Sequence, residues 1–148
     1  MNLRAWIRDG SVKRFHPHPV QIDDLLMSSF NDIDTARELV KLHRYGFARD
    51  AGYEAMLKSG MVMMFAHGLR PVIGGHHVTI VRFTESELGA GHEELIASFD
   101  RFRRTRHERL YEGRDNATKS EAMHAIDCAE QLLSIARERS IIKEVNYD

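Results

Sequence analysis

Apolar residues recur at intervals of three and four along most of this chain, which is the spacing of helices that bury one face. The pattern predicts helices over about 21–43, 47–67, 76–87, 95–113 and 118–139, joined by short connections that contain glycine. No stretch shows a convincing alternation of polar and apolar positions, the pattern of a β-strand. The predicted fold is therefore all-α: an up-and-down antiparallel bundle of four to five helices.

The two ends of the chain differ from this bundle in their pattern. Residues 1–19 are a predicted N-terminal arm, in which His16–Pro19 is an extended linker and Trp6 could dock on the bundle or on a second chain. The bundle is predicted over residues 20–140, and residues 141–148 form a short C-terminal tail. A length of 148 residues with 43% hydrophobic residues suffices for one domain with a genuine core.

Composition narrows the class of protein. Charged residues make up 29% of the chain and the net charge is −1, which favours a soluble globular protein and argues against broad nonspecific coating of nucleic acid. Cys128 is the only cysteine, so no intrachain disulfide can form, and a place at the edge of the core is expected for it. No apolar run has the length of a membrane span, and the N-terminus lacks a hydrophobic signal core, so we expect a cytoplasmic protein.

One arginine interrupts an apolar stripe. In a helix over 95–113, Leu95, Phe99, Phe102, Arg106 and Leu110 fall within about 80° of arc. Arginine is rarely buried unless it is paired, because an uncompensated buried charge costs several kcal/mol. Arg106 is therefore the first candidate for a functional residue.

The same segment concentrates positive charge. Six of the sixteen arginines lie within fourteen positions, and the whole chain has only five lysines. The planar fork of arginine suits contact with phosphate or carboxylate. Alternatively, some of these arginines form a solvated face in helical pairs with glutamates. The six are Arg101, Arg103, Arg104, Arg106, Arg109 and Arg114; the solvated face would comprise Arg101, Arg104 and Arg109.

Several short motifs, taken in order, resemble those of one family of helical domains. The run Arg106–Tyr111 lies near the end of a long helix, and it is followed by Gly113, a polar loop and an amphipathic helix that contains Ala129–Leu133. Upstream, a helix that contains Ala51–Leu57 leads through a glycine-bearing turn to Gly74–His77, which opens a short helix. This order, over nearly the full chain, resembles the HEPN domain (higher eukaryotes and prokaryotes nucleotide-binding), which is all-helical.

Many HEPN proteins are ribonucleases whose motif is an Arg followed, after four to six residues, by a His. The resemblance allows two alignments of this motif on the present chain. Alignment on Arg106 places Tyr111, after four residues, where the ribonuclease has its His. Alignment on Arg101 gives His107 after five residues, but Arg101 faces away from the apolar stripe. Helical phase favours Arg106, which resembles the branch with Arg, four residues and Tyr. HEPN proteins paired with minimal nucleotidyltransferases carry a Tyr two residues after the His, whereas position 113 is Gly here.

The chemistry of these side chains separates binding from cleavage. Metal-independent RNA cleavage needs a group that moves protons near neutral pH and a cation that stabilises the developing charge. A phenol has a reference pKa near 10, so Tyr111 suits a hydrogen bond to phosphate better than general-base work. His107 could supply an imidazole, especially where two chains pack this helix together. The candidate catalytic residues are Arg106, His107 and Tyr111; the candidate nucleotide- or RNA-binding residues are Arg101, Arg103, Arg106 and Arg109.

The resemblance also implies partners. HEPN domains are typically homodimers with the motif helices near the two-fold axis, which would place two copies of Arg106 in one basic cleft. A nucleotide or RNA is the implied ligand, and a metal-independent endoribonuclease is the implied activity if the protein is an enzyme. A role as the toxin of a toxin–antitoxin or stress module, with a nucleotidyltransferase as antitoxin, is a further expectation.

Two alternatives stay open at this point. Arg106 could bridge to a carboxylate such as Glu54, Asp100 or Asp127 and only order the bundle of a non-catalytic interaction module. His67, His76 and His77 could bind zinc, but the usual ligand spacing is missing and adjacent histidines point apart on a helix, so neither a metal nor a cofactor is expected.

Overall fold

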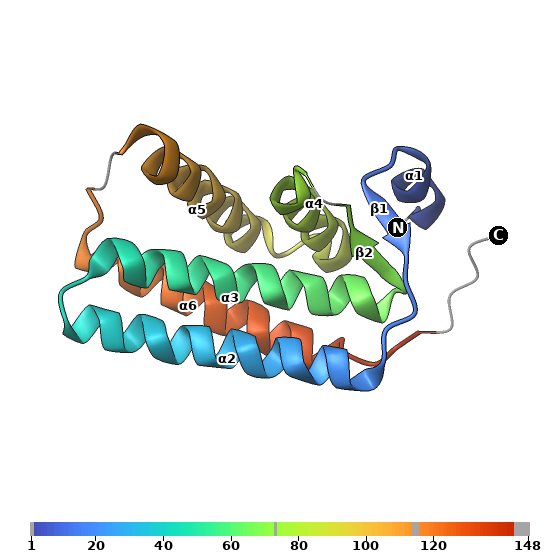
Figure 1. Ribbon diagram of the computed structural model, residues 1–148, viewed down its shortest axis with the longest axis horizontal. Helices are drawn as coiled ribbons and strands as arrows, with labels where there is room; N and C mark the ends of the chain where they lie inside the picture. The colour runs from blue at the N-terminus through green and yellow to red at the C-terminus, as the bar shows by residue number, and fades with distance from the viewer. Residues whose placement is uncertain (1, 73, 114–115, 144–148) are drawn as a thin grey trace.

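The computed structural model describes residues 2–72, 74–113 and 116–143. Over these residues the chain forms six helices and two short strands (Figure 1). Arg114 and the predicted tail beyond residue 143 lie outside the described residues. The helices are α1 Leu3–Arg8, α2 Pro19–Lys41, α3 Tyr45–Ala66, α4 His76–Leu88, α5 Glu93–Glu112 and α6 Lys119–Glu138, and the strands are β1 Val12–Arg14 and β2 Leu69–Pro71.

Helix α3 is the centre of the bundle. Helices α2 and α6 pack against one side of it, and α4 and α5 pack against the other side (Figure 1). Sixteen of the 22 residues of α3 are buried, so this helix is enclosed on nearly every face rather than along one stripe. Tyr53, Leu57, Gly60 and Met64, which follow one another at steps of three and four, are all buried. The all-α fold predicted from the sequence is confirmed.

Close packing of α3 against α4 depends on a glycine. A Cβ atom at Gly60 would lie 2.6 Å from Ile80 Cγ2 and 2.7 Å from Thr84 Oγ1, closer than real side chains approach. The absence of a side chain therefore lets α4 come close to α3 at this level.

The long helices begin at recognisable caps. His18 Nδ1 accepts the Val20 N–H at 3.2 Å, and the Gln21 side chain accepts the His18 N–H at 2.8 Å, at the start of α2. The His16–Pro19 segment, predicted as an extended linker, therefore ends as the cap and first residue of a helix. At the start of α6, Thr118 Oγ1 accepts the Glu121 N–H at 3.1 Å.

The N-terminal segment contains two features of the fold that the sequence pattern did not indicate, helix α1 and strand β1. Strand β1 pairs antiparallel with β2, with Val12 opposite Pro71 and Arg14 opposite Leu69. Strands of three residues are too short to show alternation, which is why none was predicted. The segment also docks through Trp6, whose ring lies 6.1 Å from that of Phe83 in α4. Among the described residues, no helix is both long and apolar enough to cross a membrane.

Candidate functional site at the end of α5

The apolar stripe of α5 is buried over its first half and then reaches the surface. Leu95, Phe99 and Phe102 are buried, whereas Leu110 is 50% exposed. Arg106 lies at the transition, and its side chain is 29% exposed. The prediction of a continuous apolar stripe through Leu110 was therefore wrong, because α4 is shorter than α5 and the last turns of α5 extend beyond it (Figure 1). Arg106 is a rim residue rather than an interior one.

Arg106 is held against α3. Its Nη2 lies 3.2 Å from Glu54 Oε1, and its guanidinium carbon lies 6.0 Å from the centroid of the Tyr53 ring. Glu54 is thus the partner among the three carboxylates that the sequence suggested. The pair is partly exposed, since the Glu54 side chain is 38% exposed, so each group keeps contact with water.

Tyr53 and His77 form a buried polar contact behind Arg106. The Tyr53 hydroxyl lies 2.9 Å from His77 Nδ1. Burial lowers the pKa of His77 to about 4, and the charges of His76, Arg106 and Arg103 act in the same direction. Burial also raises the pKa of Tyr53. His77 is consequently neutral at physiological pH, and its free nitrogen can accept the hydrogen bond that the Tyr53 hydroxyl donates. This contact ties α4 to α3.

Arg109 makes the second contact between α5 and α3. Its Nη2 pairs with Asp50 Oδ2, and its guanidinium carbon lies 5.5 Å from the centroid of the exposed Phe47 ring. Burial raises the pKa of the Asp50 carboxyl, and the charges of Arg109 and Arg49 oppose that rise. Arg109 was a predicted phosphate ligand, but in this structure a carboxylate is its polar partner.

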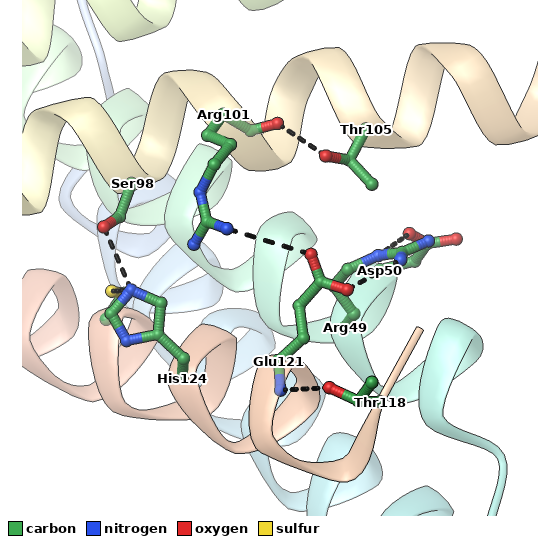
Figure 2. A network of polar contacts seen from close by, with 9 residues as sticks. Arg49, Asp50, Ser98, Arg101, Thr105, Thr118, Glu121 and His124 are labelled. Atoms are coloured by element: carbon green, nitrogen blue, oxygen red, sulfur yellow. Dashed lines mark hydrogen bonds and ion pairs between the residues drawn. The ribbon is translucent and has the colours of Figure 1, made fainter. Parts of the chain in front are cut away.

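A buried arginine extends this network to α6. The Arg49 side chain is 3% exposed; its Nε lies 3.6 Å from Asp50 Oδ1, and its Nη1 lies 3.5 Å from Glu121 Oε2. Figure 2 shows Glu121 between Arg49 and Arg101, whose Nη1 lies 3.9 Å from Glu121 Oε1. The backbone N–H of Glu121 is part of the cap of α6, and its carboxylate links two arginines on different helices.

Sequence reasoning did not single out Arg49, although a signal was present. Arg49 precedes Tyr53 by four residues and Gly60 by eleven, so it falls on the apolar stripe of α3. The argument that selected Arg106 applies equally to Arg49, and the structure shows that Arg49 is the more deeply buried of the two.

The remaining arginines of α5 are paired within the helix. Arg103 Nε lies 2.9 Å from Asp100 Oδ1, and Arg104 Nε lies 3.4 Å from Asp100 Oδ2. Every arginine on the described part of α5 therefore has a carboxylate partner. Five arginines share four carboxylates, so the positive field that the sequence predicted is largely balanced inside the protein.

His107 and Tyr111 lie on an exposed face of α5. They are one turn apart, and their ring centroids are 4.6 Å apart. Tyr111 is 76% exposed. Adjacent residues of a helix point about 100° apart, so His107 faces solvent while Arg106 turns toward α3. The structure brings His107 and Tyr111 together and places Arg106 beside them rather than in contact with them.

A polar contact nearer the start of α5 joins this helix to α6, through Ser98, His124 and Cys128. Ser98 Oγ lies 3.0 Å from His124 Nε2, and Cys128 Sγ lies 3.7 Å from the same nitrogen (Figure 2). Burial raises the pKa of the Cys128 thiol, which disfavours the nucleophilic thiolate. This agrees with the predicted place of Cys128 at the edge of the core.

The histidines considered for zinc have separate partners. His67 Nε2 lies 2.7 Å from Glu87 Oε2, whereas His77 bonds to Tyr53. Within the residues that the structure describes, no group of three or more His, Cys, Asp or Glu side chains is arranged to hold a metal ion.

A groove of about 970 Å³ runs between α4 and the first half of α5. Trp6, Ile96, Arg82 and Arg103 are among its lining residues, and Arg106 is not. Arg106 lies outside this groove, and its side chain is partly exposed beside Glu54.

The fold and the site define an all-α domain in which the arginine-rich helix α5 is joined to α3 and α6 through ion pairs. The end of α5 leaves His107 and Tyr111 exposed. The family model for the HEPN domain matches residues 22–139, most of the chain. The chain therefore belongs to the HEPN domain family, which confirms the resemblance found in the sequence. Comparisons with curated proteins and with solved structures gave no match.

Proposed function

We propose that this HEPN protein binds the phosphate of a nucleotide or an RNA at the exposed end of α5. The observation that supports this proposal is the placement of Arg106 and Arg109 at the seam between α3 and α5. Their side chains are 29% and 22% exposed, and Glu54 and Asp50 hold them in place. An ordered, partly exposed guanidinium loses little freedom when it binds a ligand.

The geometry of arginine allows one guanidinium to serve two anions. Arg106 pairs with Glu54 through Nη2, and among the described residues this is its only carboxylate partner. A guanidinium has five N–H groups in a planar fork, so other N–H groups of Arg106 remain for a phosphate oxygen. Tyr111, which is exposed one turn further on, can donate a hydrogen bond to the same ligand.

Cleavage of the RNA is a further step of this proposal. His107 is the imidazole at the exposed end of α5, and it would take the proton of the ribose 2′-hydroxyl as that oxygen attacks the adjacent phosphorus. The bond from phosphorus to the 5′-oxygen breaks, the leaving oxygen takes a proton from water, and Arg106 stabilises the negative charge on the phosphate. A metal-independent endoribonuclease of this kind would suit the toxin of a toxin–antitoxin module with a nucleotidyltransferase partner. Incubation of the wild type and of His107→Ala with single-stranded RNA in EDTA tests this step. Cleavage by the wild type alone supports it. If neither protein cleaves the RNA, the proposed function is reduced to binding.

Thermal unfolding with nucleotides and short RNAs tests the binding itself. A ligand at about 100 times its dissociation constant adds about 2.7 kcal/mol to the stability of the folded state. We expect such stabilisation in the wild type and in Arg104→Ala, and its loss in Arg106→Ala. Arg104→Ala is the matched control, because it removes the same charge from a mostly exposed position on the same helix.

A non-catalytic interaction module is the second candidate, because every arginine on the described part of α5 already has a carboxylate partner. In that case Arg106 only orders the bundle. The same melts distinguish the two functions: no shift with any ligand in the wild type, together with a large loss of stability in unliganded Arg106→Ala, would favour the interaction module.

A further inference from the structure

An aromatic side chain is exposed beside the proposed phosphate site. Phe47 lies in the first turn of α3 and is 58% exposed, whereas every other residue of this helix is buried or only partly exposed. The four residues around it are all buried: Gly46, Ala48, Arg49 and Asp50. A single exposed apolar side chain needs no explanation, so the surroundings of Phe47 decide its role.

The surroundings of Phe47 are both cationic and apolar. The guanidinium carbon of Arg109 lies 5.5 Å from the centroid of the Phe47 ring. The end of α2, the start of α3 and the end of α5 all lie at the same end of the long axis of the molecule (Figure 1). Leu42, Leu110 and Tyr111 belong to this end, and they are 67%, 50% and 76% exposed. Exposed apolar side chains therefore gather where the arginines of the site lie.

The ion pairs of the site place Phe47 in line with the proposed phosphate ligands. Glu54, Asp50 and Phe47 are separated by steps of four and three, so they share one face of α3. Glu54 pairs with Arg106, and Asp50 pairs with Arg109. Phe47 lies beyond both pairs, about 10 Å along α3 from Glu54. The order along the seam between α3 and α5 is thus Arg106, Arg109 and the phenyl ring.

We infer that Phe47 is a base-stacking residue of this site and that the ligand is a single strand of RNA. The inference rests on the proposed function, because Arg106 and Arg109 supply the contact to phosphate. A base next to the bound phosphate packs on the phenyl ring. In a duplex the faces of the bases are covered by their neighbours, so only a single strand offers a free base face. Arg109 beside the ring suits such a contact, since bases also pack on guanidinium groups.

The charge balance of the site favours a contribution from stacking. Glu54 and Asp50 each pair with an arginine, so the seam has little excess positive charge. Contact with phosphate alone would therefore give weak binding, because that contribution comes from the release of counterions by free cations. Stacking on an aromatic ring does not depend on net charge. With two arginines on phosphate, the logarithm of the binding constant should fall with the logarithm of the salt concentration at a slope of about −1.4.

Fluorescence anisotropy with a short single-stranded RNA, and with the same strand in a duplex, tests the inference. Phe47→Ala should weaken binding of the single strand about fivefold or more. Phe47→Leu should weaken it similarly, because leucine is apolar but has no ring. Phe47→Trp should bind within about twofold of the wild type or more tightly, because the indole ring also stacks. The duplex should bind the wild type about fivefold or more weakly than the single strand.

Phe30→Ala is the matched control. Phe30 is also an exposed phenylalanine, at 45%, and the guanidinium carbon of Arg137 lies 5.9 Å from its ring centroid, but it belongs to α2. Its replacement should change binding by less than about twofold. Phe47 is exposed, so its variants should keep the thermal unfolding of the wild type, which shows that each one is folded.

Arg106→Ala, measured with the same strand, separates failure of this inference from failure of the proposed function. Weak binding by Phe47→Ala and Phe47→Leu, with recovery in Phe47→Trp, supports stacking. Unchanged binding by Phe47→Ala together with weak binding by Arg106→Ala would overturn stacking and leave the phosphate site in place. Equal binding by the leucine and tryptophan variants, or a duplex bound as tightly as the single strand, would also overturn the inference. No binding of RNA by the wild type would overturn both.

Discussion

Replacement of Arg49 by Met should be among the most destabilising single changes in this protein. The Arg49 side chain is 3% exposed and lies between Asp50 and Glu121. Its removal takes a positive partner away from both of these largely buried carboxylates. Breaking a buried ion pair from one side typically costs about 3–5 kcal/mol. We expect about 3 kcal/mol here, because Asp50 retains Arg109 and Glu121 retains Arg101 and some contact with water.

Arg106→Met is the matched comparison, since it removes the same group from a partly exposed pair. The Arg106 and Glu54 side chains are 29% and 38% exposed, and such pairs contribute about 0–1 kcal/mol. Urea unfolding followed by circular dichroism at neutral pH gives both values from the transition midpoints, provided that the slopes stay equal. If Arg49→Met is too unstable to fold, Glu121→Gln supplies a milder change at the same contact.

The comparison can refute the assignment of roles. If Arg106→Met costs as much as Arg49→Met, Arg106 is a structural residue and the proposed binding site loses its central group. If Arg49→Met costs less than about 1 kcal/mol, the buried network contributes little, and the account of how α3, α5 and α6 are joined is wrong.

Two further predictions concern the contacts of α4. Because the folded-state pKa of His77 is about 4 and its ordinary value is 6.5, the unfolded chain binds more protons between these values. Stability should therefore be complete above pH 6.5 and fall toward pH 4 by about 1–2 kcal/mol, after allowance for solvent screening. Urea unfolding at both pH values should show a smaller fall in His77→Phe, because phenylalanine has no group that binds a proton, and an equal fall would contradict the assignment. Gly60→Ala should lower the melting temperature at a cost of about 1–3 kcal/mol, because its Cβ would press on Ile80 and Thr84; a raised melting temperature would mean that α4 can move away freely.

The sequence predicted the long helices well because their signals are local. The apolar period and the caps placed α2, α3 and α6 within a few residues of their observed bounds. The family was also found from local motifs and their order, and the family model confirms it. The β1–β2 pair was missed because pairing of Val12 with Pro71 joins segments far apart in the sequence, and three residues carry no readable alternation.

The electrostatics of the site were less predictable. Helical phase placed Arg106 on the stripe of α5, but it could not show that α4 is too short to cover that turn, which therefore lies at the surface. Ion pairs such as Arg106 with Glu54 and Arg109 with Asp50 join residues more than fifty positions apart. The count of arginines in one segment therefore overstated the free positive charge, since three of the four compensating carboxylates come from α3 and α6 and the fourth is Asp100 of α5.

The affinity of the protein for a short single-stranded RNA, measured by fluorescence anisotropy, tests the central claim most directly. A charge-assisted hydrogen bond to phosphate contributes about 1.5–3 kcal/mol, so Arg106→Ala should weaken binding about tenfold or more. Arg104→Ala removes the same charge from an exposed position and should weaken binding less than about threefold. Equal effects of the two substitutions, or no binding by the wild type, would contradict the claim that the guanidinium of Arg106 is available to a phosphate.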